Sequence, residues 1–331
     1  MAGLNAIFVW NDKGVTMRNF LFMGLLTLFL MPHLLCTSQS DSGTKDFSQR
    51  QIRVVTTTGM IADAVKNVGG ERIDVIALMG PGVDPHLYKA SEGDVNRMSG
   101  ADIIFYNGLH LEGKMTEIFE RLRNRKTTVA IGEKIQKQDL LAPPEFEGNY
   151  DPHIWFDVSL WLKAISAIYE TLTEMDSTHR QIYSDNFNQY QSELTDLHRY
   201  VLERASQVQP DQRVLVTAHD AFNYFGRAYG FEVRGLQGIS TATEAGTADM
   251  QNLAEFIVAR RIPAIFVESS VPPRSIEALK AAVESRKFNV RIGGNLFSDA
   301  MGDAGTPQGN YVGMVRHNID TIVNALLSGN Q

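Results

Sequence analysis

The sequence predicts an α/β fold of two lobes, each with a mostly parallel sheet flanked by helices, joined by one long rigid α-helix. Two observations predict it. Strand-like and helical stretches alternate on both sides of the middle of the chain, which is the pattern of parallel βαβ units. Residues 157–207, between them, contain no strand candidate. The 331 residues suffice for one large or two medium domains, and the 44% hydrophobic content is that of an ordinary globular protein.

Residues 1–40 are expected to form a signal or anchor segment. Arg18 precedes an apolar run over 20–35, which is short for a membrane span and is followed by small polar residues. This order is typical of an export signal. Residues 1–16 fit it poorly, so Met17 is an alternative start of the chain.

The single cysteine, Cys36, directly follows the apolar run, so no disulfide can form within the chain. Three alternatives stay open for this segment: a lipid anchor on Cys36, cleavage after Ser40, and an uncleaved signal that itself serves as the anchor. Each of them places the mature protein outside the cytoplasmic membrane.

A disordered linker over 41–51 is expected to lead into an N-terminal α/β lobe over 52–177, because the linker is polar. Runs rich in β-branched residues predict strands, and stretches with helical periodicity predict helices. The strands are expected at 52–58, 72–79 and 101–108, and the helices at 60–70 and 92–99.

A linking helix is expected over 178–207. Apolar or aromatic residues recur there in steps of four and three, and the opposite face is polar. They are Tyr183, Phe187, Tyr190, Leu194, Leu197 and Val201. A helix of roughly 25–30 residues would be about 40 Å long. We expect it to tie the lobes together as a strut; the alternative is a helix packed on one continuous domain.

A C-terminal α/β lobe is expected over 208–331, where the alternation resumes. Its strands are expected at 213–218, 231–236, 264–269 and 288–293, and its helices at 248–260, 273–286 and 314–326.

One tripeptide, Asp-Pro-His, occurs twice, ending in His86 and in His153. Proline fixes its own φ and restricts the residue before it, so each histidine is presented from a stiffened turn. A neutral imidazole on a rigid loop is a good metal ligand. Asp84 and Asp151 either hold the imidazoles in place or make turn hydrogen bonds.

Two further candidates follow strands of the second lobe. His219 comes after 213–218, and Asp299 follows the strand near 288–293. Ligand sites in open α/β sheets lie outside the carboxyl ends of the strands. Three imidazoles and one carboxylate suffice for a divalent cation. Glu268 is a rival fourth ligand or a supporting group, and Asp303 is a weaker rival.

The other histidines are expected to serve the structure. His110 follows a strand but has apolar neighbours, and His317 lies on the last helix as a hydrogen-bonding residue. His179 and His198 lie on the polar helix and should be solvated, and His33 lies in the signal.

Signatures of catalysis and of nucleic-acid binding are absent. The sequence contains no His-Glu-x-x-His, Gly-x-Ser-x-Gly, phosphate-binding loop or dinucleotide fingerprint. The net charge is −7 with no basic cluster, which argues against nucleic acid as a partner. A closed shell of three histidines and an aspartate suits capture and release of an ion, whereas a catalytic metal usually keeps a position open for water.

Several long motifs together resemble one known family. They are VDPHLY, NGLHLEGKM, DPHIWFD, VLVTAHDAFNYFGRAYGFEVRGLQGIST and LFSDAMGDAGTPQGNYVGMVRHNIDTI, within 52–328. The chain resembles the TroA-like metal-binding proteins of zinc and manganese ABC importers, the cluster A-I solute-binding proteins. The resemblance implies a metal in the cleft between the lobes. The implied ligands are His86 and His153 from the first lobe and His219 and Asp299 from the second.

The resemblance also implies how the protein works. It implies limited lobe motion, delivery of the ion to a membrane permease driven by a cytoplasmic ATPase, and a monomer. The expected location is the periplasm or the outer face of the cytoplasmic membrane.

The metal is expected to be zinc or manganese, with iron(II) as a further candidate. Zinc specialists of the family often carry a His-rich loop, but 132–149 contains no histidine. The chain therefore resembles the type with three histidines and an aspartate, which is implied to take both zinc and manganese. Imidazole-rich coordination and the divalent affinity order favour tighter zinc binding.

Two alternatives belong to other functional classes. A secreted metal-dependent hydrolase would need an exchangeable water on the metal and a base such as Glu268. A surface adhesin would use the metal as a structural staple, and it should unfold when the metal is removed.

Overall fold

Helices and strands alternate along the chain in the computed structural model, which describes residues 47–146 and 148–328. The predicted signal, with Met17, Cys36 and Ser40, lies outside the described residues. No helix among the described residues has the length and apolar character needed to cross a membrane. Phe47 is buried, and Arg50 donates to the Asp102 carboxylate at 2.6 Å, so the chain is already packed a few residues before the first strand.

The first sheet has four parallel strands in the order β2-β1-β3-β4. They are β1 (Ile52–Thr56), β2 (Ile73–Ala77), β3 (Ile103–Tyr106) and β4 (Thr127–Ala130). The first three confirm the predicted strands, with shorter bounds. The sequence analysis misses β4, because four residues beginning with two threonines carry little apolar periodicity.

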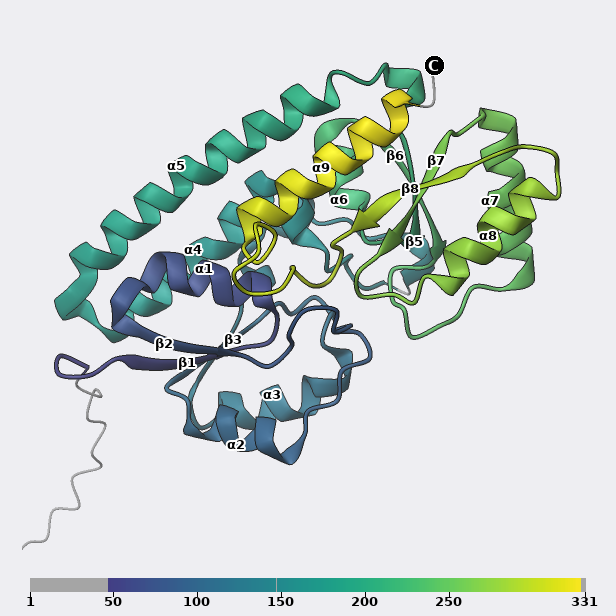
Figure 1. The fold of residues 1–331 in the computed structure, drawn as a ribbon. Coiled ribbons are helices and arrows are strands. Elements are labelled where there is room, and N and C mark those ends of the chain that lie inside the picture. Colours follow the sequence, from purple (N-terminus) through teal and green to yellow (C-terminus); the bar gives the residue numbers. More distant parts are fainter. Residues whose placement is uncertain (1–46, 147, 329–331) are drawn as a thin grey trace, which may run out of the picture. The chain divides into compact units, whose positions relative to one another are not determined.

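Helices cover both faces of this sheet, with α1 and α4 on one side and α2 and α3 on the other (Figure 1). They are α1 (Gly59–Gly69), α2 (Glu92–Gly100), α3 (Thr116–Arg123) and α4 (Val158–Met175). Successive residues of a strand point to opposite faces. Val54 accordingly joins the core cluster that contains α1 and α4, whereas Val55 joins the cluster that contains α2 and α3. Both faces of the parallel sheet are therefore buried, as such sheets require.

The long helix is α5 (Arg180–Ala205), with 26 residues, or about 39 Å at 1.5 Å per residue. It packs on α1 and α4 and also on α9. The Tyr190 hydroxyl donates to Asp63 of α1, and the Tyr200 hydroxyl donates to Asp320 of α9. The prediction of one long amphipathic helix is confirmed, and the helix runs alongside elements from both ends of the chain (Figure 1).

The second half contains two parallel strand pairs, β5-β6 and β7-β8, with β5 next to β7. The strands are β5 (Val214–His219), β6 (Glu232–Gln237), β7 (Ala264–Glu268) and β8 (Arg291–Leu296). The helices are α6 (Asn223–Tyr229), α7 (Thr247–Arg260), α8 (Arg274–Glu284) and α9 (Tyr311–Leu327). In Figure 1, α7 and α8 lie on one side of these strands, and α6 and α9 lie on the other.

This half departs from the predictions at its last strand, at the start of α9, which begins three residues earlier than expected, and at α6. The strand expected at 288–293 begins three residues later and ends nearer to Asp299. The sequence analysis also misses α6, a helix of seven residues with three aromatic side chains, because it is too short to show a helical period.

Short 3-10 helices occupy several connections. They are η1 (Gly70–Arg72), η2 (Gly113–Met115), η3 (Ile131–Lys134), η4 (Lys137–Asp139), η5 (Pro144–Phe146), η6 (Ile154–Phe156), η7 (Ser177–His179) and η8 (Pro210–Gln212).

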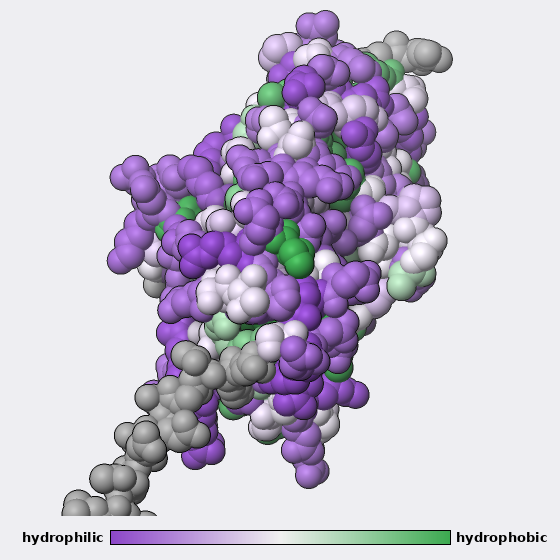
Figure 2. Space-filling model, turned by 90° about the vertical axis from the view of Figure 1, so that its left-hand side faces the viewer, coloured by the Kyte–Doolittle hydropathy of each residue, from purple (hydrophilic) through white to green (hydrophobic). Residues whose placement is uncertain are grey.

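The face shown in Figure 2 is mostly hydrophilic, with apolar side chains in small separate patches. The α/β class, the parallel sheets and the long helix agree with the predicted fold.

Candidate metal centre

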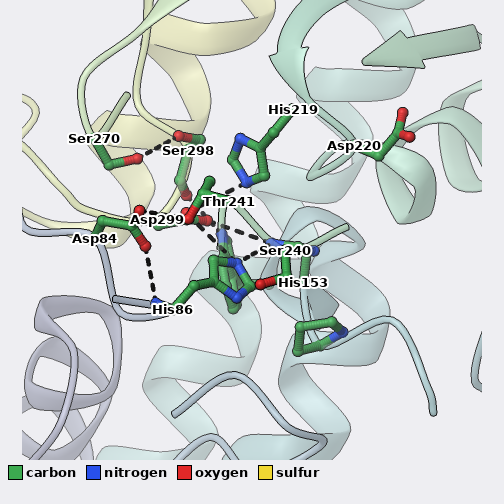
Figure 3. A network of polar contacts seen from close by, with 12 residues as sticks. Asp84, His86, His153, His219, Asp220, Ser240, Thr241, Ser270, Ser298 and Asp299 are labelled. Atoms are coloured by element: carbon green, nitrogen blue, oxygen red, sulfur yellow. Dashed lines mark hydrogen bonds and ion pairs between the residues drawn. The ribbon is translucent and has the colours of Figure 1, made fainter. Parts of the chain in front are cut away.

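Three histidines and one aspartate meet at one buried point, although they come from four distant segments (Figure 3). His86 lies in the loop after β2, His153 comes just before η6, His219 is the last residue of β5, and Asp299 follows β8. One ligand atom from each lies within 4.8 Å of the others. All four side chains are buried, with 4% exposure at most.

The distances within the group suit a small cation. His86 Nε2 lies 3.3 Å from His153 Nε2, and His219 Nε2 lies 3.3 Å from Asp299 Oδ2. His153 Nε2 lies 3.5 Å from Asp299 Oδ1. The structure therefore brings together the four residues that the sequence analysis selected, and their donor atoms face one another.

The first Asp-Pro-His turn holds the backbone of its histidine. Asp84 Oδ1 accepts a hydrogen bond from the His86 backbone N–H at 2.8 Å. Asp84 Oδ2 accepts one from the Thr241 hydroxyl at 2.5 Å. Of the two roles considered for Asp84, the turn hydrogen bond is the one observed.

The second turn holds both the backbone and the ring of its histidine. Asp151 Oδ1 lies 3.0 Å from the His153 backbone nitrogen and 2.8 Å from ring Nδ1. Asn107 Nδ2 donates to the Pro152 carbonyl, and the Tyr224 hydroxyl donates to the Asp151 carbonyl. These bonds orient Nε2 of His153 toward Asp299 and fix the loop that carries it.

Glu268 supports His219 rather than joining the group. Its Oε1 accepts from the His219 backbone N–H at 2.9 Å, and its Oε2 lies 2.6 Å from Nδ1, an ion-pair contact without the geometry of a hydrogen bond. The opposite ring nitrogen, Nε2, is the one that faces Asp299. The other rival, Asp303, is exposed and lies outside the group.

The electrostatics of the group are those of a carboxylate surrounded by imidazoles. Burial by itself would raise the pKa of Asp299, but His219, His153 and His86 lower it below its usual value. Burial lowers the pKa of His86 to about 3. Burial would also lower the pKa of His219, but Glu268 and Asp299 raise it well above its usual value. The negative charge of Asp299 is thus stabilised by its neighbours.

Several polar atoms of the group have no hydrogen-bond partner. Both carboxylate oxygens of Asp299 and Nε2 of His219 are buried and make no hydrogen bond to the residues that the structure describes. Buried polar atoms are normally paired, because leaving one unpaired costs free energy. A cation among them would satisfy all three, which makes this donor set a fit for a divalent transition metal.

The other four histidines that the structure describes, His110, His179, His198 and His317, lie outside the group. His110 is exposed, has a φ of 72° and packs edge-on against Phe146. His317 Nε2 lies 3.0 Å from the Asn295 carbonyl, as expected of a structural residue. His179 and His198 were predicted to be solvated, but each is half-buried and bonded. Their Nδ1 atoms lie 2.9 Å from Asp176 and 3.1 Å from the Tyr229 hydroxyl, respectively.

Most of the chain matches the model of one protein family. The model of the ZnuA family, described as the periplasmic component A of the zinc-uptake complex, matches residues 54–325. The chain belongs to the ZnuA family.

Two curated relatives and one solved structure support this membership. The chain is 55% identical over 273 residues to the zinc-binding protein TroA of Treponema pallidum, covering 82% of this chain and 88% of the relative. It is 42% identical over 304 residues to the manganese-binding lipoprotein MntA of Bacillus subtilis, covering 92% and 99%. The structure of the periplasmic zinc-binding protein TroA from Treponema pallidum superimposes with a TM-score of 0.82 at 54% identity, covering 83% and 99%. The two-lobe architecture predicted from the sequence fits this structural match.

The sequence analysis of this ZnuA-family chain missed the residues that support the loops of the group. Asn107, Tyr224 and Thr241 bond to the two Asp-Pro-His turns from segments far away in the sequence. Asn107 gives a weak signal, because it is a polar residue just after a buried strand. Tyr224 and Thr241 give none, because their partners depend on how the chain folds back.

Proposed function

We propose that this chain is the extracytoplasmic solute-binding protein of an ABC importer for a divalent transition metal. His86, His153, His219 and Asp299 bind one ion, which is then delivered to a membrane permease driven by a cytoplasmic ATPase. Family membership supports the transport role. The observation that carries the site is the buried group of three imidazoles and one carboxylate whose facing atoms lack partners.

The proposed cargo is zinc or manganese, with iron(II) as a weaker competitor. The relatives named above are a zinc-binding and a manganese-binding protein. Three imidazole nitrogens favour zinc, and the general affinity order of divalent ions places zinc above manganese and iron(II). We therefore expect tighter zinc binding in solution, whereas the ion carried in the cell also depends on availability and on the permease.

The proposed role is that of a carrier and not of an enzyme. A catalytic zinc keeps a coordination position open for water and needs a base beside it. Here four protein donors face one another, and Glu268, the carboxylate considered above as a base, is engaged with His219. This arrangement supports capture of an ion over hydrolysis.

The proposed division of the chain places two ligands on each side of the site. We assign His86 and His153 to a lobe over 52–177, and His219 and Asp299 to a lobe over 208–331, joined by the helix over 178–207. A metal bound by all four would hold the two lobes together. We place the mature protein in the periplasm or on the outer face of the cytoplasmic membrane, in keeping with the family description.

Metal analysis of the purified protein tests this proposal. The full chain is stripped with a chelator, and Zn²⁺ and Mn²⁺ are then titrated separately and in competition. We expect one ion per chain, bound reversibly, with zinc displacing manganese. The absence of stoichiometric binding would refute the proposed function, and substrate turnover by the zinc-loaded protein would favour a hydrolase.

A further inference from the structure

The three imidazoles of the candidate metal centre are not supported alike. His153 and His219 each have a carboxylate oxygen within 2.8 Å of the ring nitrogen that faces away from the group. For His86, the only carboxylate oxygen within 4.0 Å of a ring nitrogen, among residues 47–146 and 148–328, belongs to Asp299 of the group itself. The bond from Asp84 reaches only the His86 backbone N–H. His86 therefore depends on its loop for its position.

The loop that carries His86 is partly exposed, although Val83 and Tyr88 pack against the cluster that contains α2 and α3. Gly82 and Leu87, on either side of His86, are exposed, and Leu87 has half of its surface in contact with solvent. Gly82 has a φ of 70°, a conformation that gives the chain a sharp turn at this point. Asp84 lies between Gly82 and Leu87 and is half-buried. One of its carboxylate oxygens accepts from the His86 backbone N–H, and the other accepts from the Thr241 hydroxyl.

Thr241 comes from a loop of the other half of the chain, over 238–246. Its first end is fixed by β6, where Gln237 pairs with His219, and by the bond from the Asp220 N–H to the Gly238 carbonyl. Its second end is fixed by the bond from the Gly246 N–H to Asp249 of α7. Between these ends, Thr241 bonds to Asp84, 157 residues away in the chain, and Figure 3 shows both beside the histidines.

We propose that Thr241 is a positioning residue that holds His86 in the metal site through Asp84, so that the Thr241–Asp84 bond must break before His86 can leave a bound ion. The bond joins the loop that contains Thr241, anchored next to His219, to the least supported ligand. Its loss would free Asp84 Oδ2 for water and let the His86 loop move, while His153 and His219 keep their carboxylate supports. This inference rests on the proposed function, because it concerns release of the ion.

The release rate of Zn²⁺ from the full chain, measured by stopped-flow transfer to a chromogenic chelator, tests this inference. Thr241→Val keeps the shape of the side chain but removes the hydroxyl, and we expect release at least about tenfold faster, the lower end of the effect of removing a group that orients a metal ligand. Thr241→Ser keeps the hydroxyl and should release at close to the wild-type rate.

Thr243→Val is the matched control. Thr243 lies on the same loop, is exposed, and makes no side-chain hydrogen bond to the described residues. This variant should behave as wild type. The melting temperature of each metal-free variant shows whether it is folded, and Thr241→Ala replaces Thr241→Val if the latter does not fold.

A double mutant shows whether faster release comes from loss of the Thr241–Asp84 bond or from a general loosening of the loop that contains Thr241. In an Asp84→Ala background, Thr241→Val should add no further acceleration, because the bond is already absent. Release from Thr241→Val at the wild-type rate, or equal acceleration by Thr243→Val, would overturn the inference while leaving the proposed function intact. A wild-type protein that binds no stoichiometric Zn²⁺ would overturn both.

Discussion

Hydrogen bonds hold the backbone at His153 independently of its ring, so we expect that its imidazole can be removed with little effect on the surrounding backbone. Asp151 also bonds to its backbone N–H, and Asn107 and Tyr224 bond to the residues before it. These bonds do not involve the ring. A change at the ring should therefore affect the bound ion far more than the fold.

We predict that His153→Ala lowers Zn²⁺ affinity by more than about 100-fold, because loss of a ligand should exceed the 10–100-fold cost of losing a group that only orients one. The circular dichroism spectrum should not change. Competition titration against a zinc chelator measures the affinity. His110→Asn is the control, since this histidine is exposed and asparagine tolerates its positive φ. Unchanged affinity in His153→Ala would remove this residue from the site.

Asp176 is a second residue whose environment has a measurable consequence. It accepts a hydrogen bond from the Tyr183 hydroxyl at 2.7 Å, and it lies 2.9 Å from His179 Nδ1 and 3.5 Å from Arg72. Burial would raise its pKa, but the bonds from His179 and Tyr183 lower the pKa below its usual value. A carboxylate with a lowered folded-state pKa stabilises the fold above its unfolded pKa of about 3.9, and this contribution is lost as the pH falls through the folded pKa.

We therefore predict that Asp176→Asn reduces the free energy of unfolding at pH 7 and that the difference from wild type shrinks toward pH 3. Urea unfolding of the metal-free protein at both pH values measures it. Asp196→Asn serves as the comparison, because its pair with Arg199 is mostly solvent-exposed and should contribute little. If the difference in unfolding free energy between Asp176→Asn and wild type stayed constant with pH, the lowered pKa of Asp176 would be contradicted.

The helix α5 is the element whose packing the sequence predicted best. Its buried residues are Tyr183, Tyr190, Leu194, Leu197, Val201 and Ala205, which recur at helical spacing. They join the largest apolar cluster, so most of the stability of α5 comes from this buried face and little from helix propensity.

We predict that Leu197→Ala destabilises the protein by about 2–5 kcal/mol, because Leu197 is fully buried and the change leaves a cavity. Leu202→Ala, on the same helix but 42% exposed, should change stability by less than about 0.5 kcal/mol. Chemical denaturation of both variants measures the difference. Equal effects would mean that α5 does not pack by the face described.

In the molecule as a whole, one apolar cluster extends from α1 and α4 through α5 to α6 and α9. Trp155 Nε1 donates to the Ser298 carbonyl at 3.0 Å, and the Tyr311 hydroxyl donates to the Trp155 carbonyl at 2.7 Å. The residues next to His153 and Asp299 are thus joined by the core and by buried hydrogen bonds. We therefore expect the protein to stay folded without a metal.

We predict that the chelator-stripped protein melts cooperatively, with an unchanged circular dichroism spectrum. Added Zn²⁺ should stabilise it by mass action, by about 2.7 kcal/mol when the free ion is at 100 times its dissociation constant. Differential scanning calorimetry of the stripped and reloaded protein measures this. Unfolding on stripping would instead indicate a structural staple.

The sequence by itself determined the α/β class, the long helix and the identity of the four candidate ligands. Strand and helix periods are local patterns, and the repeated Asp-Pro-His turns and strand ends are visible without a fold. The short elements β4 and α6 escaped, because four and seven residues hold too little of a period to be recognised.

Only the tertiary structure decided how the candidate ligands are supported. It placed Glu268 behind His219, gave Asp151 and not Asp84 a bond to an imidazole ring, and brought Thr241 to Asp84. Such contacts join residues as far as 157 positions apart, so no local pattern encodes them. They arise because packing of the sheets against the helices sets which polar groups meet. Buried polar groups must then find partners among the neighbours that packing provides.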